Sequence, residues 1–377
     1  MSLRGVYIAV HGGAGVHSHT REDEVKQALR VACTEGLKCI GITTKAQRDG
    51  TRLQMVENAV SCLEDNPNLN AGYGSNLTLH GTVECDAAIM DGRSGDFGSV
   101  GAVSGIKNPI RVARAILDYS KVPDPLGRIP PLTLVSEGAH AFAVAHCADG
   151  KSQSVPAESL IASRSKREWE EWKARLDRGD YGTESQVENI RDIQDTVGAV
   201  VCEGTVDGIS AGVSSGGILL KHPGRIGEAA MFGAGCWAQY FPKAKLGIAC
   251  SVSGAGESIV RATIARAIGD GFKDCISKEE EVDPHSIIST VVVDRFCGPC
   301  RDRGEVNLDV GIILLVTEDI ENKITARLWC AFTTPSMAIA YASSETPKPK
   351  AQILRRPKSK PSSLTSEPHI FITAISL

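Results

Sequence analysis

A hydroxyl-bearing residue marks the junction between a polar segment and an apolar run. In the stretch IQDTVGAVV, residues 193–201, Thr196 follows Asp195 and precedes the apolar residues 197–201. Such a run indicates a buried strand. If the bond between Asp195 and Thr196 is cut, Thr196 becomes a chain terminus whose free α-amine has an ordinary pKa of about 7.7–8.0. That amine can act as the base for the hydroxyl of the same residue. The pattern is compatible with a threonine nucleophile that needs no separate His–Asp pair, although taken alone it favours a threonine that merely starts a strand.

The elements on either side of this junction alternate between strand and helix patterns. Before it, residues 5–148 are rich in Gly, Ala and Val, with apolar residues at helical spacing between short strand-like runs. After it, the runs TVGAVV, GISAGV and KLGIACSV read as strands, and ESIVRATIARAIGDGF as a helix. These patterns predict two α/β parts, 1–195 and 196–377, joined by a polar segment.

A polar segment separates the two parts. Residues 149–194 have little strand pattern, although SRSKREWEEWKARLDRG fits an amphipathic helix with Trp169, Trp172 and Leu176 on one face. We expect this segment to be a mobile, exposed linker that ends at Asp195, where a strained bond is easily cut. The Pro-, Lys- and Ser-rich stretch at 345–377 predicts a disordered tail.

Composition limits the functional classes. The 377 residues carry a net charge of −4, without the basic footprint that nucleic-acid binding requires. The apolar run at 6–10 is too short for a secretory signal, and no run approaches a membrane span. We expect a cytoplasmic or nuclear protein with reduced thiols. The pair Cys297 and Cys300, in CGPC, is interpreted as part of a loop rather than as a redox or zinc motif.

A serine esterase is an alternative that the same chain permits. HGGAG, residues 11–15, resembles an esterase oxyanion loop, and GVSSG places Ser214 in a G-x-S-x-G pattern with His222 or His285 as the base. The context disfavours it, because a nucleophile elbow needs a following helix, and GGILLKHPGR is a poor helix start.

Many motifs in order carry a resemblance to a known family. They are HGGAG, NAGYGSNL, ECDAAIMDG, FGSVGAVSGIKNP, GRIPP, DTVGAVV, VSSGG, LKHPGRIG, GCWA and SVSGAGE. From about Val6 to Ala342 the chain resembles the type 2 asparaginase family of N-terminal-nucleophile hydrolases, and within it the threonine aspartases (taspases). The resemblance implies an αββα sandwich, made as a proenzyme that cuts itself between Asp195 and Thr196.

The resemblance also implies roles for individual residues. Thr196 is the nucleophile, Ser215 the second active-site hydroxyl and Asn70 an active-site amide. Ser253 and Gly254 belong to the loop on the oxyanion side. The substrate-binding residues that it implies are Arg225, Glu228, Gly256 and Arg21.

The implied substrate is an aspartyl group whose carboxylate is held by Arg225. A taspase cuts proteins after Asp, whereas other members act on asparagine or β-aspartyl peptides and use an Asp to bind the substrate α-amine. Glu228 occupies that Asp position, so asparaginase or isoaspartyl dipeptidase activity is the alternative. Arg21 stands where the taspase pattern has Lys.

The resemblance implies no metal or cofactor. It implies protein substrates such as trithorax-type histone methyltransferases and a general transcription factor precursor, and assembly as an αβ heterodimer or its dimer.

Overall fold

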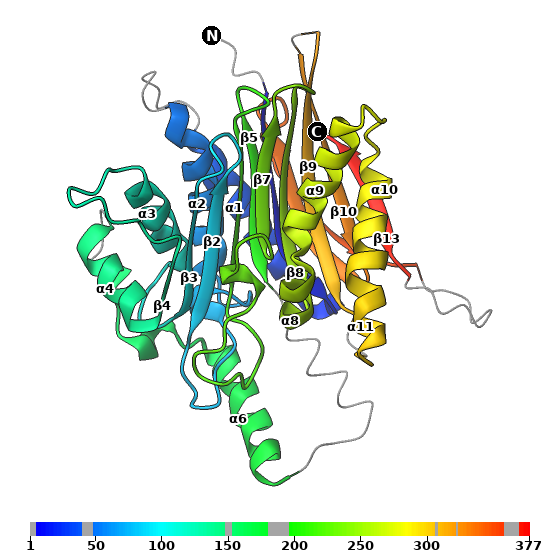
Figure 1. Cartoon of the computed structure of the whole chain (residues 1–377). Helices are drawn as coiled ribbons and strands as arrows, with labels where there is room; N and C mark the ends of the chain where they lie inside the picture. Colours follow the sequence, from blue (N-terminus) through cyan, green and yellow to red (C-terminus); the bar gives the residue numbers. More distant parts are fainter. Residues whose placement is uncertain are drawn as a thin grey trace.

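Two stacked β-sheets with helices on both outer faces make up the fold (Figure 1). The computed structural model describes residues 5–39, 48–147, 153–179, 196–305, 308–321, 323–357 and 369–377, with the side chains of 48–50 left aside. The strands are β1 (Val6–Gly15), β2 (Cys85–Asp91), β3 (Phe97–Val103), β4 (Thr133–Val135), β5 (Val197–Glu203), β6 (Ile209–Ser215), β7 (Cys236–Phe241), β8 (Leu246–Gly254), β9 (Val310–Ile320), β10 (Lys323–Phe332), β11 (Ser336–Ser343), β12 (Lys350–Arg355) and β13 (Phe371–Ser376). The α-helices are α1 (Glu22–Leu37), α2 (Arg48–Glu64), α3 (Pro109–Ser120), α4 (Ser136–His146), α6 (Ser163–Asp177), α8 (Gly256–Ala262), α9 (Ile264–Ser277), α10 (Pro284–Thr290) and α11 (Gly298–Asp302).

The larger sheet has eight strands in the order β12-β11-β1-β5-β6-β2-β3-β4. Its pairs are antiparallel except for β3 with β4, which run parallel. Strands β5 and β6 come from the second part of the chain and lie between β1 and β2, which come from the first part. The two parts are therefore interleaved in one sheet. Thr196 directly precedes β5, one of the inner strands of this sheet.

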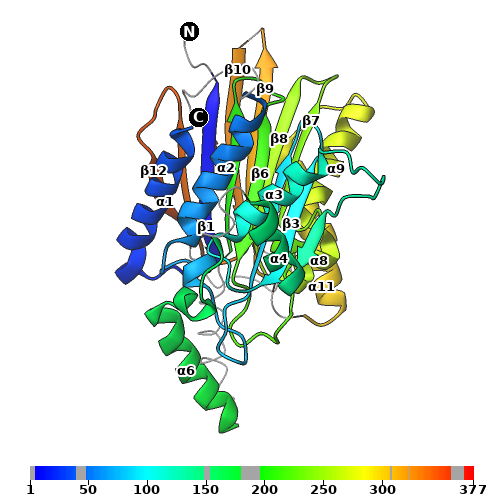
Figure 2. The ribbon, with the colours of Figure 1, turned by 90° about the vertical axis from the view of Figure 1, so that its left-hand side faces the viewer.

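The smaller sheet has five antiparallel strands in the order β13-β10-β9-β8-β7. Its outer face is covered by α9, α10 and α11, while α1, α2 and α3 cover the outer face of the larger sheet (Figures 1 and 2). The predicted αββα sandwich is thus confirmed.

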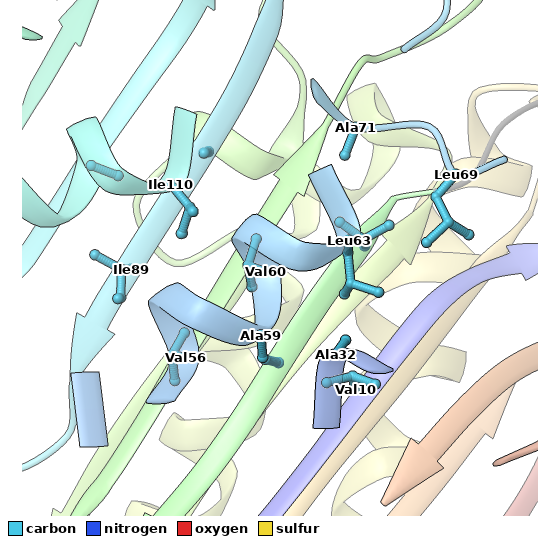
Figure 3. Packing of buried hydrophobic residues seen from close by; sticks show 14 of the residues in the cluster. Val10, Ala32, Val56, Ala59, Val60, Leu63, Leu69, Ala71, Ile89 and Ile110 are labelled. Atoms are coloured by element: carbon cyan, nitrogen blue, oxygen red, sulfur yellow. The ribbon is translucent and has the colours of Figure 1, made fainter. Parts of the chain in front are cut away.

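Strand periodicity explains why four layers pack together. On β1, Ile8 and Val10 contribute to the core beneath the helices α1 and α2, whereas Tyr7 and Ala9 face the core between the two sheets. Successive side chains of a strand point to opposite faces, so an all-apolar strand can be buried on both sides. Figure 3 shows the helix side of this packing, where Val10 lies near Ala32, and Ala59 and Leu63 of α2 lie in the same layer.

The polar segment between the two parts is folded over much of its length. Helix α6 forms where the amphipathic pattern placed it, and Trp169 donates from Nε1 to the Thr78 carbonyl at 2.8 Å. Arg164 Nη2 and Ser165 Oγ both donate to the Gly74 carbonyl, at 2.8 and 3.1 Å. Residues 153–179 are therefore docked on the domain rather than forming a free linker. Residues 180–195, which include the expected cleavage point, lie outside the described residues.

Two sequence-based expectations are wrong. The predicted disordered tail contains β12, paired with β11, and β13, paired with β10. The stretch around CGPC is helical rather than a loop: Cys297 ends a π-helical segment, Val291–Cys297, and Cys300 lies in α11. Both thiols are buried, and all twelve cysteines are free. No helix among the described residues is long and apolar enough to cross a membrane.

Candidate active site

The β5–β6 hairpin brings two hydroxyl groups together. Val197 on β5 lies opposite Ser214 on β6. Because the strands are antiparallel, one residue earlier on β5 and one residue later on β6 meet next. Thr196 Oγ1 accordingly lies 3.1 Å from Ser215 Oγ, which also accepts a hydrogen bond from Gly217 N at 3.0 Å. Thr196 is buried at the head of a rigid strand, so its hydroxyl has a fixed position.

The backbone of Thr196 is tied to the smaller sheet. Ser253, near the end of β8, accepts hydrogen bonds from Thr196 N at 3.4 Å and from Ala14 N at 3.2 Å. Ala14 belongs to HGGAG, which forms the end of β1 rather than an esterase-type loop. Nearby, His11 Nε2 lies 2.8 Å from Ser251 Oγ, and burial lowers the pKa of His11 to about 3, so the imidazole is neutral.

A buried carboxyl group contacts the Thr196 hydroxyl. Glu228 begins a short 3₁₀ turn, Glu228–Ala230, and its Oε1 lies 2.7 Å from Thr196 Oγ1. Burial raises the pKa of Glu228, because desolvation penalises the ionised form. The hydrogen bond from Thr196 and the charge of Arg225 act in the opposite direction.

Arg225 lies beside this carboxyl group and already holds another one. Its Nε and Nη2 donate to Glu257 Oε1 and Oε2 at 2.8 and 2.7 Å. A Cβ placed on Gly256 would lie 2.6 Å from Arg225 Nη2 and 2.6 Å from Glu228 Oε2. The absence of a side chain at Gly256 thus lets the Arg225 guanidinium and the Glu228 carboxyl group both approach this backbone position.

A second buried carboxylate holds this part of the site in place. Asp86 on β2 accepts from Ala102 N and from Gly227 N, both at 2.8 Å. Gly227 lies between Arg225 and Glu228, so Asp86 positions both side chains through the turn that carries them. Sequence reasoning missed Asp86 and Glu257 as individual residues, although both lie in quoted motifs, ECDAAIMDG and SVSGAGE.

Asn70 is close to the site but is bonded to its supporting loop. Its Nδ2 donates to the Gly217 carbonyl at 2.8 Å, and its backbone carbonyl accepts from Gly216 N at 2.9 Å. Its Oδ1 accepts from Asn76 N at 2.8 Å. Asn70 therefore fixes the loop that follows Ser215. Its role as an active-site donor stays a prediction.

Three predicted residues remain: Gly254, Arg21 and Asp195. Gly254 follows Ser253 with a φ of +140°, and an added Cβ would lie 2.2 Å from the Asp309 carbonyl, so the loop requires glycine. Arg21 donates to the Asn68 carbonyl at 3.2 Å and lines a cavity of about 190 Å³ that Asn70 also borders. The structure does not bring Arg21 into the Thr196–Ser215–Glu228 contacts. Asp195 lies outside the described residues.

The geometry contradicts the esterase alternative. Ser214 lies within β6, and its Oγ donates to the buried Glu64 Oε1 at 2.7 Å. No helix follows it directly, because Ser215 ends the strand and Gly216 and Gly217 continue into a loop. A nucleophile elbow is therefore absent at this position. Within the described ranges, no group of three or more His, Cys, Asp and Glu side chains gathers into a metal-binding cluster.

These contacts describe a site built around one hydroxyl at the head of a central strand. The layered fold is that of the N-terminal-nucleophile hydrolases. The chain belongs to the asparaginase family, whose model matches residues 4–298.

Two named groups of relatives support this assignment. A plant-type L-asparaginase of Pyrococcus horikoshii is 35% identical over 271 residues, which cover 70% of this chain and 79% of the relative. The isoaspartyl peptidase/L-asparaginase of Mus musculus is 35% identical over 262 residues, covering 69% of this chain and 70% of the relative. The Homo sapiens protein of the same name is 36% identical over 262 residues, covering 69% and 74%.

Proposed function

We propose that the chain is a self-cleaving threonine hydrolase that acts on aspartyl compounds, with Thr196 as the nucleophile. The observation that carries this proposal is the placement of Thr196 Oγ1 between Ser215 Oγ and Glu228 Oε1, at 3.1 and 2.7 Å, beside the guanidinium of Arg225. In the proposed reaction, Thr196 Oγ1 attacks the substrate carbonyl carbon, the bond to the leaving nitrogen breaks, and water then hydrolyses the resulting ester. The free α-amine formed by cleavage of the 195–196 bond acts as the base.

Free aspartyl compounds, asparagine and β-aspartyl dipeptides, are the first substrate class. These molecules carry an α-carboxylate and an α-ammonium group close together. Arg225 offers a bidentate partner for the carboxylate, and Glu228 Oε2 and Arg225 Nη2 both lie next to Gly256. The names of the relatives, L-asparaginase and isoaspartyl peptidase, favour this class as well.

An endopeptidase that cuts proteins after Asp is the second candidate, and one contact favours it. Glu228 Oε1 is turned onto Thr196 Oγ1 instead of being free for a substrate ammonium. Arg225 would then be the main recognition group, and it can hold the single carboxylate of an internal Asp side chain. The motifs that resemble threonine aspartases, and the sequence Ile193-Gln194-Asp195 before Thr196, agree with this class. Its substrates would be proteins with an accessible internal Asp.

One set of assays tests the function and separates the two classes. The purified chain should appear as two fragments, 1–195 and 196–377, and the second should begin Thr-Val-Gly-Ala-Val. The cut protein is then incubated with L-asparagine, with β-aspartyl-leucine, and with a peptide containing Ile-Gln-Asp in ordinary α-linkage. Turnover of the first two alone assigns the asparaginase class, whereas cleavage of the peptide after Asp assigns the endopeptidase class. An uncut chain that is nevertheless active would contradict the proposed mechanism.

A further inference from the structure

The uncut chain lacks the base that the mature site uses. Before cleavage, the nitrogen of Thr196 belongs to a peptide bond, and its lone pair is delocalised into the neighbouring carbonyl. It cannot accept a proton from the Thr196 hydroxyl. Self-cleavage therefore needs another group within hydrogen-bond reach of Thr196 Oγ1.

The contacts of the hydroxyl identify that group. Among the described residues, Thr196 Oγ1 has hydrogen-bond partners in Ser215 Oγ and Glu228 Oε1. Ser215 is a neutral alcohol, whose Oγ already accepts from Gly217 N. His11, on β1, is bonded through Nε2 to Ser251 Oγ. Glu228 is thus the partner that can ionise and take the proton directly, over 2.7 Å.

We propose that Glu228 is the general base that activates Thr196 for cutting its own chain. This inference rests on the self-cleaving function proposed above, and it gives Glu228 a role distinct from substrate binding. Two charged side chains act on Glu228: Arg225, from the same loop, and Asp86, from β2. Their opposite signs, together with the burial of Glu228, allow a carboxylate that is more basic than an exposed one.

Self-cleavage then proceeds through an ester intermediate. The Oγ1–H bond of Thr196 breaks, its proton moves to Glu228 Oε1, and Oγ1 bonds to the carbonyl carbon of residue 195. The bond from that carbon to the Thr196 nitrogen then breaks, and Glu228 returns the proton to the nitrogen, which becomes an amine. Water hydrolyses the ester, releasing the carboxyl terminus of residue 195 and restoring the Thr196 hydroxyl. No oxidant, metal or co-reactant other than water is consumed.

The structure supplies a matched control for this proposal. Glu64 is also a buried glutamate, and its Oε1 contacts a serine hydroxyl, Ser214 Oγ, at the same distance of 2.7 Å. Ser214 is not the nucleophile. Glu64→Gln therefore reproduces the chemical change of Glu228→Gln, the loss of a buried carboxyl group bonded to a hydroxyl, at a position that does not touch Thr196.

The test follows conversion of freshly synthesised full chain into its two fragments over time. We expect Glu228→Gln to slow cutting by about 100-fold or more, the usual range for loss of a general base. Glu64→Gln should cut within about threefold of wild type, and Thr196→Val should never cut. The rate for wild type should rise with pH as Glu228 ionises, and this rise should be lost in Glu228→Gln. If Glu228 had only a structural role, the cutting rate of Glu228→Gln would still rise with pH.

A second variant keeps the proposal falsifiable if Glu228→Gln folds poorly. Glu228→Ala leaves space beside Thr196, and added formate, a small carboxylate, should restore part of the cutting rate. Folded Glu228→Gln protein that cuts within about threefold of wild type would overturn the base assignment while leaving the proposed function intact. Wild-type chain that never cuts would instead refute the self-cleaving function, and the base assignment would fall with it.

Discussion

The guanidinium of Arg225 is held by the carboxylate of Glu257 through two parallel hydrogen bonds of 2.8 and 2.7 Å. The side chain of Arg225 is 13% exposed, whereas that of Glu257 is 56% exposed. Glu257 is therefore the partner that can swing into solvent. In the proposed function its carboxylate occupies the fork that a substrate carboxylate would need, so substrate and Glu257 would compete for the same cation.

This competition predicts that Glu257→Gln lowers KM for aspartyl substrates by about two- to fivefold and leaves kcat nearly unchanged. The change is modest because an exposed ion pair contributes at most about 1 kcal/mol. Steady-state kinetics on whichever substrate class the assays above identify measures this change of KM. Asp124→Asn is the control, because it breaks a similar two-bond pair with Arg128 in an exposed turn outside the site. A raised KM in Glu257→Gln would show that Glu257 positions Arg225 rather than blocks it.

The close packing around Gly256 predicts a second outcome. Gly256→Ala would place a methyl group 2.6 Å from both Arg225 Nη2 and Glu228 Oε2, so these two side chains would have to shift away from their positions in the site. Because Gly256 starts α8 without a positive φ, the helix itself tolerates alanine. We expect at least about a tenfold loss of kcat/KM with a melting temperature within a few degrees of wild type. Gly138→Ala, which meets open space on α4, should leave kcat/KM unchanged.

Part of the candidate site could be predicted from the sequence, and part could not. The resemblance implies Thr196 and Ser215 as two hydroxyl groups of one active site, and the hairpin register places them in contact. Arg225 and Glu228 were also predicted to lie at one site. Their mutual placement depends on Asp86, whose bonds cross from β2 to another loop, and on Glu257, which comes from a third element. Contacts of this kind join segments far apart in the chain, and no local pattern reveals them.

The two wrong expectations have separate physical reasons. Strands β12 and β13 lie at the edges of their sheets, where one side of the strand is unpaired. Edge strands tolerate Lys, Pro and other polar residues, which protect them from pairing with other chains. The composition of the tail therefore resembles disorder although parts of it pair. Pro299 near the start of α11 is compatible with a helix, because the first turn needs no donor from it.

Substitutions at Thr196 test the nucleophile directly. Thr196→Val keeps the shape of the side chain but removes Oγ1, so self-cleavage and turnover of added substrate should both vanish, with the fold retained. Thr196→Ser should keep both reactions at a lower rate, because the methyl group that restricts the rotamer is lost. Mass spectrometry of the chain and substrate assays measure the two effects. Ser214→Ala is the control, because Ser214 contacts Glu64 rather than Thr196. Loss of activity in Ser214→Ala alone would restore the esterase hypothesis.

The last prediction concerns Glu64, whose buried carboxyl group accepts from Ser214 Oγ and from Ile110 N at 2.7 and 3.0 Å. Burial raises the pKa of Glu64 from 4.5 to about 8, so the folded chain keeps a proton that the unfolded chain releases. The stability that this group contributes is complete below pH 4.5 and is lost as the pH rises through about 8.

We therefore expect the free energy of unfolding to fall with pH between about 5 and 8 by up to about 1.4 kcal/mol per pH unit relative to Glu64→Gln, which cannot ionise. Urea unfolding of both proteins at several pH values measures this difference. The Thr196→Val background keeps the chain uncut, so that unfolding involves one molecule. Histidines and other titrating groups are common to both proteins and cancel in the difference. Parallel curves across this range would mean that Glu64 has an ordinary pKa, and that its environment is more polar than its contacts indicate.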